Sequence, residues 1–306
     1  MFAEMALLIA LQSIVIPLGH PRVNEVPKAP IETAGPLWAA QCDGSDDWNK
    51  AAPPVRIHAN TYLVGSCGIS SILIVGDQGD ILIDGGTEQD ADLIADNIRE
   101  LGFPLNGVKL ILSSHEHPDH IGGIARLQKL TGATVAASAQ AAKVLTTGIA
   151  NDDDPQAGTL GKVPTATVGR IIHDGEEVRL GNLMLTAMAT PGHTSGALSW
   201  RWDSCDGGVC RTIVYADSLT PVSAPSYRFS DHPAYLAAYR ASIAKVAASP
   251  CEILLTPHPG ASDMPHRLAL GEPLLDENAC KAYAAKLTQS LDERLAKEQA
   301  PASPAK

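Results

Sequence analysis

Residues 108–131 read VKLILSSHEHPDHIGGIARLQKLT, and this stretch decides the fold. The continuous apolar run at 108–114 is typical of a strand that is buried on both faces. A helix is expected over about 121–131, because an apolar periodicity continues to Gly132, a favoured C-terminal cap. Between strand and helix lies the segment 115–120, which is rich in histidine. The stretch therefore predicts a buried strand that leads directly into a polar, potentially reactive turn.

Short apolar runs alternate with helical patterns on both sides of this stretch. Further strands are expected at 71–75, 80–84, 134–138, 168–172, 176–180, 183–189, 196–202, 211–216 and 252–255. Further helices are expected over about 89–101, 232–248 and 276–298, the first of them opened by a Thr87–Asp90 capping box. The runs at 71–75 and 80–84 indicate a hairpin. We expect an α/β fold in which two packed sheets carry helices on both outer faces, with residues 40–299 forming one domain.

Two segments do not fit this alternation. Residues 5–18 (MALLIALQSIVIPL) resemble the apolar part of a secretory signal, although Glu4 precedes them and no Lys or Arg does. The alternative is a buried N-terminal helix. We expect residues 1–30 to be a signal peptide with a Pro-rich leader, the loop or linker running over 17–36. The segment 148–165 lacks periodicity and is long for a connection, which marks it as a candidate functional loop.

The six cysteines suit an exported, disulfide-bonded protein. Cys205 and Cys210 flank DGGV, which indicates a tight turn that brings them within bonding distance. The spacing leaves the pairing of the other four open. Buried free thiols in a cytosolic protein are the alternative. None of the six lies in a CxxC pair or beside the histidines, so metal binding by cysteine is disfavoured.

The segment His115-Glu116-His117-Pro118-Asp119-His120 concentrates metal ligands at a strand end. In an extended chain, residues i and i+2 point the same way, so His115 and His117 can bind one metal together. Asp119 and His120 then face a second metal nearby. Burying these groups without a partner would cost several kcal/mol in desolvation, which favours the metal.

Two other histidines, His193 in ATPGHTSG and His258 in LLTPHPG, also follow strands and lie beside Gly or Pro. Three ligands for each metal leave a position open for water, as in catalytic sites. Imidazole and carboxylate ligands suit zinc, with iron or manganese also compatible. The remaining five histidines need no special role.

Charge and hydropathy exclude two classes of partner. The formal net charge is −11, and no run of Lys or Arg is present, so the chain lacks the basic surface that nucleic acid requires. No stretch approaches 18 consecutive apolar residues, which argues against a membrane span. Aromatic residues make up only 4% of the chain, so aliphatic side chains must build the core.

The HEHPDH segment, the downstream GHT and a third downstream histidine resemble the HxHxDH signature of the metallo-β-lactamase superfamily. The resemblance extends from about residue 40 to 295 and is greatest to subclass B3, because His120 is present, no cysteine ligand is available, and residues 215–229 (YADSLTPVSAPSYRF) resemble the active-site loop of that subclass. It implies a four-layer αβ/βα sandwich that binds two Zn²⁺. His115, His117 and His193 would bind the first ion, and Asp119, His120 and His258 the second.

The resemblance also implies an activity. A hydroxide between the zinc ions would open the β-lactam ring of an antibiotic, conferring resistance, with Asp119 orienting the hydroxide as a catalytic residue. Ser218 and Thr220 resemble hydroxyls that contact substrate or water, and Gln156 is a further candidate for substrate contact. The six cysteines resemble a branch with the pairs Cys42–Cys67, Cys205–Cys210 and Cys251–Cys280. Such a protein would be periplasmic or secreted, and we expect a monomer.

Two other functions remain open at this point. Asp217 resembles an aspartate that bridges metals in other superfamily hydrolases, so a lactonase or a glyoxalase II-like thioesterase is the first alternative. The second is a periplasmic zinc-binding protein without turnover. A nuclease of the superfamily is disfavoured by the charge of −11.

Overall fold

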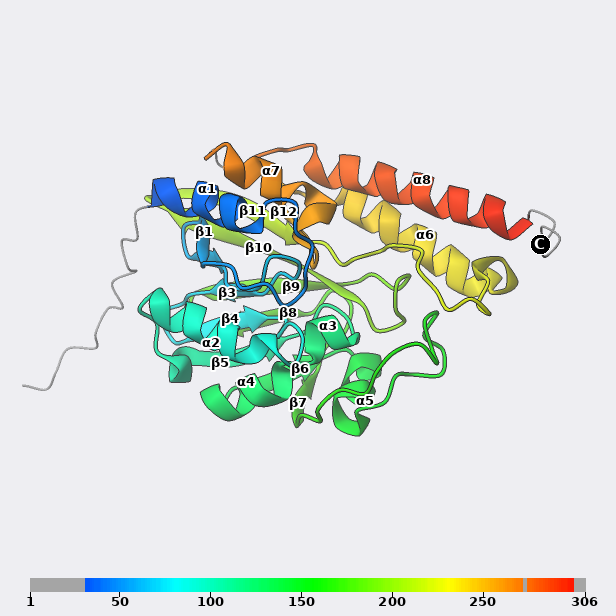
Figure 1. Cartoon of the computed structure of the whole chain (residues 1–306), viewed down its shortest axis with the longest axis horizontal. Coiled ribbons are helices and arrows are strands. Elements are labelled where there is room, and N and C mark those ends of the chain that lie inside the picture. The colour runs from blue at the N-terminus through cyan, green and yellow to red at the C-terminus, as the bar shows by residue number, and fades with distance from the viewer. Residues whose placement is uncertain (1–30, 272–273, 300–306) are drawn as a thin grey trace, which may run out of the picture.

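The computed structural model describes residues 31–271 and 274–299. The export signal expected over 1–30 lies outside these residues. Two β-sheets pack face to face, and helices cover their outer faces (Figure 1). The expected two-sheet α/β architecture is therefore confirmed.

The larger sheet has seven strands in sequence order, and its first four strands run antiparallel to one another. From the fourth strand to the seventh, neighbours are parallel, so these strands end at the same edge of the sheet. The strands are β1 (Val55–His58), β2 (Thr61–Leu63), β3 (Ile72–Ile74), β4 (Asp80–Ile83), β5 (Val108–Leu112), β6 (Thr134–Ala137) and β7 (Val168–Ile171).

The smaller sheet has five strands in the order β12-β11-β10-β9-β8. Its last two strands along the chain, β11 and β12, run parallel, whereas the other neighbours are antiparallel. The strands are β8 (Glu177–Leu180), β9 (Leu183–Ala189), β10 (Leu198–Asp206), β11 (Val209–Tyr215) and β12 (Ile253–Leu255).

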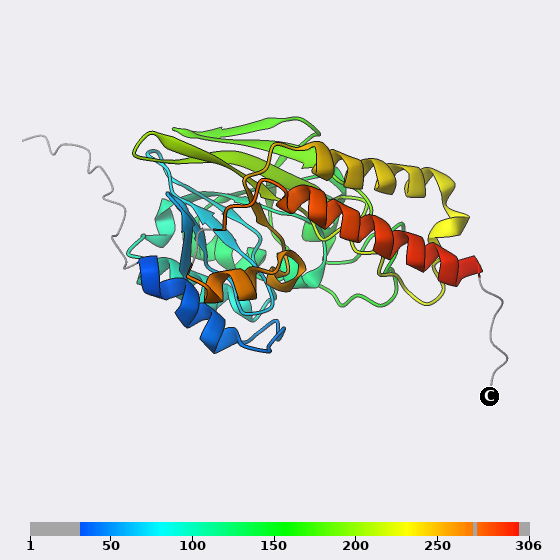
Figure 2. The ribbon, with the colours of Figure 1, turned by 90° about the horizontal axis from the view of Figure 1, so that it is seen from above.

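The helices complete two further layers (Figures 1 and 2). Helices α2, α4 and α5 cover the larger sheet, while α6 and α8 lie side by side over the smaller one. Helices α1 and α7 pack together and add Trp38, Met264 and Leu268 to the core between the sheets. The bounds are α1 (Ile31–Cys42), α2 (Asp90–Glu100), α3 (Pro118–Ile121), α4 (Ile124–Thr131), α5 (Ala139–Thr147), α6 (Pro233–Ala248), α7 (Met264–Ala269) and α8 (Ala279–Gln299), with 3₁₀ turns η1 (Leu105–Gly107), η2 (Phe229–Asp231) and η3 (Pro259–Ser262).

The capping box predicted for α2 is present. The Asp90 amide donates to Thr87 Oγ1 at 3.3 Å, and the Thr87 amide donates to Asp90 Oδ2 at 3.1 Å. The hairpin is also confirmed, because β3 and β4 pair antiparallel. Strand β5 ends at Leu112, two residues before the expected end, because Ser113 and Ser114 already belong to the turn that carries the histidines.

The loop or linker expected over 17–36 is wrong from Ile31 onward, where α1 begins and continues through Pro36. The helix expected over about 121–131 is confirmed as α4, which ends at Gly132 as expected but begins three residues late, and the short helix α3 precedes it. They meet at Gly122–Gly123, and a Cβ on Gly123 would lie 2.2 Å from Gly85 O, so only glycine fits there. Strands β1 and β2 were not predicted. Helices α5 and α7 were also not predicted.

Three disulfides join Cys42 with Cys67, Cys205 with Cys210, and Cys251 with Cys280. These are the pairs that the family resemblance implies, and all six cysteines lie within the described residues. Cys205 and Cys210 face each other across the β10–β11 hairpin. The other two disulfides fix α1 to the segment before β3, and the start of β12 to α8.

Among residues 31–271 and 274–299, no helix has both the length and the apolar character needed to cross a lipid bilayer.

Candidate metal centre

The segments that follow four strands meet at one edge of the two sheets. The turn after β5 carries His115–His120, and the β9–β10 connection carries His193. His258 follows β12, and the segment after β11 carries Asp217 and Ser218. The Leu198 amide donates to Ser114 O at 2.7 Å, which joins the two sheets directly beside His115. The topology therefore gathers residues separated by up to 143 positions.

The turn after β5 is shaped by its own sequence. His117 has extended φ and ψ angles and precedes Pro118, the first residue of α3, a position at which proline is favoured. His115 and His117 consequently face each other, with ring centroids 4.9 Å apart. Asp119 and His120 lie in the short helix that follows, so one hexapeptide presents four ligand side chains to the same space.

His193 completes a first ligand group with His115 and His117. The ring centroid of His193 lies 5.0 Å from that of His115 and 4.8 Å from that of His117. One ligand atom from each of the three lies within 4.8 Å of the others, and all three side chains are buried. We call these three residues the first group.

Asp119 and His120 lie at the other side of His115. His115, Asp119 and His120 again bring ligand atoms within 4.8 Å of one another. The expected second set contains His258 instead of His115, and His258 Nε2 lies 3.4 Å from Asp119 Oδ2, with its ring 5.1 Å from that of His120. His258 is therefore adjacent to the cluster without belonging to either tight group. We call Asp119, His120 and His258 the second group.

In four of the histidines, one ring nitrogen is already bound to the protein. His115 Nδ1 donates to Asp217 Oδ1 at 2.7 Å, and His117 Nε2 donates to Asp154 Oδ2 at 3.0 Å. The Nδ1 atoms of the other two donate to backbone carbonyls, at 2.9 Å from His193 to Thr220 and at 3.2 Å from His258 to Gly68. Such contacts fix the ring orientation and leave the other nitrogen for a metal, as is usual around metal-binding histidines.

The unpaired polar atoms fit a metal ion. His115 Nε2 and both ring nitrogens of His120 are buried and make no hydrogen bond of good geometry. Burial lowers the pKa of His193 to about 3 and holds that of His115 well below its ordinary value, so both rings are neutral, as metal ligands must be. Neutral nitrogens that face one another without hydrogen atoms between them are a natural cation site.

The second group has the opposite electrostatics. Burial opposes a charge on His120, but the carboxylates of Asp119, Asp84 and Asp217 raise its pKa to about 9. Burial would also raise the pKa of Asp119, yet the neighbouring His120 and His258 hold it well below its usual range. The pair therefore favours a positive charge between its members, which a metal ion supplies as well as a proton does.

Asp84 was not predicted, and its Oδ2 lies 3.7 Å from His120 Nδ1. It follows β4 with φ 64°, a strained angle for a residue with a side chain. Its carboxylate accepts hydrogen bonds from the Ser114 amide at 2.6 Å, the Ser114 hydroxyl at 2.7 Å and the Tyr215 hydroxyl at 2.8 Å. Burial raises its pKa to about 6. A charged residue at the end of the buried run DILID was the available signal.

The comparisons with known proteins agree with this site. The sequence profile of the "Metallo-beta-lactamase superfamily" matches residues 64–258. MIM-2 metallo-β-lactamase is 52% identical, with 87% of this chain and 98% of that chain covered, at a TM-score of 0.83. MEM-A1, described as a subclass B3 metallo-β-lactamase from a soil metagenome, is 47% identical, with 82% and 98% covered, at a TM-score of 0.80.

The chain belongs to the metallo-β-lactamase superfamily, within subclass B3. MIM-1 from Novosphingobium pentaromativorans is also similar, at 46% identity over 87% of this chain and 99% of that chain, with a TM-score of 0.84. Family membership and the His and Asp clusters together indicate a divalent-metal site.

A more distant similarity leads to another branch of the superfamily. Hydroxyacylglutathione hydrolase from Methylococcus capsulatus is 29% identical over 106 residues, which is 35% of this chain. The match spans 34% of that curated relative, about a third of its length.

In this metallo-β-lactamase site, the three residues expected to contact substrate each have different neighbours. Gln156 Nε2 is 3.4 Å from His193 Nε2, so the loop 148–165 does reach the ligands. Thr220 Oγ1 lies 3.1 Å from His193 Nδ1 and is directed at a ligand rather than at open space. Ser218 Oγ is buried without a hydrogen-bond partner.

Asp217 is buried and contacts a ligand rather than standing free. One of its oxygens accepts from His115, whereas Oδ2 has no hydrogen-bond partner. Burial raises the pKa of Asp217. An aspartate that bridges two metals needs its oxygens facing the ions, so the contact to His115 favours an orienting role here.

Proposed function

We propose that this protein hydrolyses the amide bond of β-lactam antibiotics. The observation that carries the proposal is the buried cluster in which His115 lies within ligand distance of both His117 and His193 and of both Asp119 and His120. The chain is also 46–52% identical over its domain to proteins named as metallo-β-lactamases. The acidic net charge of −11 leaves no basic surface for a nucleic acid substrate.

We further propose that the site holds two zinc ions. The first group would bind one ion through three imidazoles, and the second group would bind the other through Asp119, His120 and His258. When bound, zinc polarises a carbonyl and lowers the pKa of water to about 7, so that water can attack at neutral pH.

The chain's own residues would orient the reactants. Asp119 stays a carboxylate because His120 Nε2, at 3.1 Å, and His258 surround it, so it can accept a hydrogen bond from the attacking water. Gln156 would contact the substrate from the loop 148–165, since its amide already reaches His193. Ser218 would hold a site water with its unpaired hydroxyl, and Thr220 would orient His193.

A thioesterase of the hydroxyacylglutathione hydrolase type is the second candidate. The partial match to those relatives and the presence of Asp217 beside the ligands favour it. The engagement of Asp217 with His115 and the much longer matches to β-lactamases favour the first candidate.

A direct assay separates the two. The purified protein, loaded with Zn²⁺, is offered a chromogenic cephalosporin, a hydroxyacyl thioester of glutathione and a lactone in parallel. We expect turnover of the cephalosporin, its loss in EDTA, and its return when zinc is restored. Turnover of the thioester alone would establish the second candidate, and binding of zinc with no turnover of any substrate would leave only a binding protein.

Three further features belong to this proposal. The three disulfides favour a periplasmic or secreted protein, since such bonds persist outside the reducing cytoplasm. Residues 40–299 are proposed to fold as one domain, because the site draws ligands from both sheets. The protein is proposed to act as a monomer, since every ligand named above comes from one chain.

A further inference from the structure

His258 is the least buried of the proposed ligands. Its side chain is 34% exposed, compared with 10% for Asp119 and 0% for His120. Asp119 and His120 share one short helix, whereas His258 reaches them from the segment after β12. Its position relative to its two partners must therefore be set by contacts outside α3.

Those contacts come largely from residues 48–70. His258 Nδ1 donates to Gly68 O at 3.2 Å, and the Ser70 amide donates to Pro257 O at 2.7 Å. The indole of Trp48 packs against the imidazole, with centroids 5.9 Å apart. The Thr256 hydroxyl adds a bond to His258 O within the same loop, at 2.7 Å.

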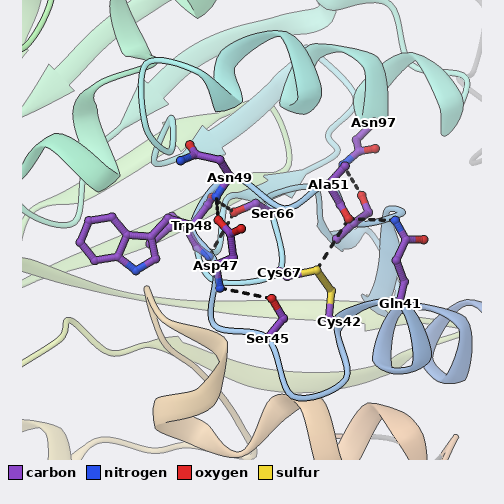
Figure 3. Close-up of a disulfide and its surroundings, with 12 residues drawn as sticks. Gln41, Cys42, Ser45, Asp47, Trp48, Asn49, Ala51, Ser66, Cys67 and Asn97 are labelled. Atoms are coloured by element: carbon purple, nitrogen blue, oxygen red, sulfur yellow. Dashed lines mark hydrogen bonds between the residues drawn. A yellow bond between two sulfur atoms is a disulfide. The ribbon is translucent and has the colours of Figure 1, made fainter.

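The Cys42–Cys67 disulfide joins the two segments that make these contacts (Figure 3). Gly68, whose carbonyl binds His258, directly follows Cys67. The Cys67 amide donates to Lys50 O at 2.9 Å, and the Ser66 hydroxyl donates to Trp48 O. A Cβ on Gly68 would lie 2.5 Å from Asp46 O, so the loop containing Trp48 rests on Gly68 itself.

We propose that the Cys42–Cys67 disulfide is a positioning device for His258 and thereby sets the affinity of the second metal site. The inference rests on the proposed function, because it takes Asp119, His120 and His258 as ligands of one ion. The disulfide joins the segment that carries the Gly68 carbonyl to the segment that leads to the Trp48 indole, and both groups contact the imidazole. Opening it frees both contacts together.

The physical reason lies in the orientation of the ring. A neutral imidazole binds a metal well only when one nitrogen faces the ion, and a fixed acceptor on the other nitrogen ensures this. Loss of such an outer contact typically lowers metal affinity about 10–100-fold. The first group should escape the effect, since its outer partners Asp217, Asp154 and Thr220 lie elsewhere in the chain.

The test is a double variant, C42S/C67S, in which no free thiol remains to capture metal. Metal-free protein is titrated with Zn²⁺ against a chromophoric chelator, so that the two binding steps are resolved without any measure of activity. We expect the first step to match the wild type and the second to weaken about 10–100-fold.

The matched control is C205S/C210S. This disulfide lies seven residues beyond Leu198 along β10, roughly 23 Å from the site edge of the strand. We expect both binding steps to be unchanged in this variant. An equal weakening in both double variants would mean that disulfides act only through general stability, and would overturn the proposal.

A second variant covers the case in which C42S/C67S does not fold. Gly68→Ala keeps the disulfide, but the added Cβ must push the Trp48 loop away from the Gly68 backbone. We expect the same selective weakening of the second step. Unchanged second-step affinity in a folded C42S/C67S variant, or in Gly68→Ala if the double variant does not fold, overturns the proposal.

The wild type distinguishes this inference from the proposed function. If it binds two ions but hydrolyses no β-lactam, the activity is wrong and the positioning role is still decided by the titrations. If it binds only one ion, the two-ion site and the role of the disulfide both fail.

Discussion

The two ligand groups of the centre differ in how firmly the protein holds them. In the first group, His115 and His117 are oriented by the buried carboxylates of Asp217 and Asp154, and His193 by the Thr220 carbonyl. In the second group, His258 is partly exposed and depends on a surface loop.

This difference indicates that the ligands of the first ion are better preorganised than those of the second. The first group is complete within the protein interior, so its geometry exists before an ion arrives. The second group combines a short helix with a separate loop, so its geometry depends on how α3 and the loops around His258 are held. We therefore expect the second group to bind its ion more weakly than the first group does, so the second ion should be lost first.

The largest expected effect comes from Asp119→Asn. The amide lacks the negative charge that holds His120 and His258 together, and it cannot accept a proton. The second ion should bind much more weakly while the first remains, and turnover should fall about 10²-fold or more. Metal content after dialysis and steady-state rates with the chromogenic cephalosporin give the two readings.

The opposite result would contradict the division of the centre into two ligand groups. If Asp119→Asn keeps two ions and the wild-type rate, Asp119 is neither a ligand nor a catalytic residue, and the second group as defined does not exist. If Asp119→Asn instead weakens the binding of both ions equally, the two groups form one site whose ions cannot be separated.

A smaller effect is expected from the buried carboxylates behind the first group. Asp217→Asn and Asp154→Asn each remove one charge that orients a ligand, which should lower first-ion affinity about 10–100-fold. Asp217 should have the wider effect, because its charge also acts on His120 of the second group. Competition titrations of the two variants should thus show both steps weakened in Asp217→Asn and only the first in Asp154→Asn. Identical titration curves for the two would contradict this wider role of Asp217.

The local parts of this centre could be predicted from the sequence. A buried strand, a proline at the first helical position and alternating histidines specify their geometry within a dozen residues, so HEHPDH was readable as a ligand cluster. The layered fold followed for a similar reason, since alternating strand and helix patterns are local signals.

The supporting contacts could not be predicted, because they join distant residues. Asp217 is 102 positions from His115, Asp154 is 37 from His117, and Gly68 is 190 from His258. Nothing in the local pattern of either partner specifies such a pairing. Asp154 was visible only as part of a loop without periodicity. The same limit explains why α1 was not predicted. Pro36 argues against a helix in the local sequence, whereas packing against the distant α7 stabilises it.

The smallest expected effect is a pH dependence of stability that arises from the scaffold and not from the metal centre. Asp80 and Asp84 lie at opposite ends of the β4 segment, and only Asp84 supports a ligand. Burial raises the pKa of Asp80 to about 6 from 3.8. The folded protein thus keeps a proton that the unfolded chain releases, so this group lowers stability as pH rises from about 4 to 6.

Asp80→Asn should remove that dependence, because the amide does not titrate and its oxygen can still accept from the Gly76 amide, now at 3.3 Å from Asp80 Oδ1. Relative to wild type, the variant should gain up to about 3 kcal/mol of unfolding free energy between pH 4 and 7. Thermal unfolding of both proteins across this range measures the gain, and metal loss at low pH cancels in the difference. Asp96→Asn on the exposed face of α2 is the matched control and should show no such slope. A gain from Asp80→Asn that is independent of pH would show that Asp80 does not titrate in this range.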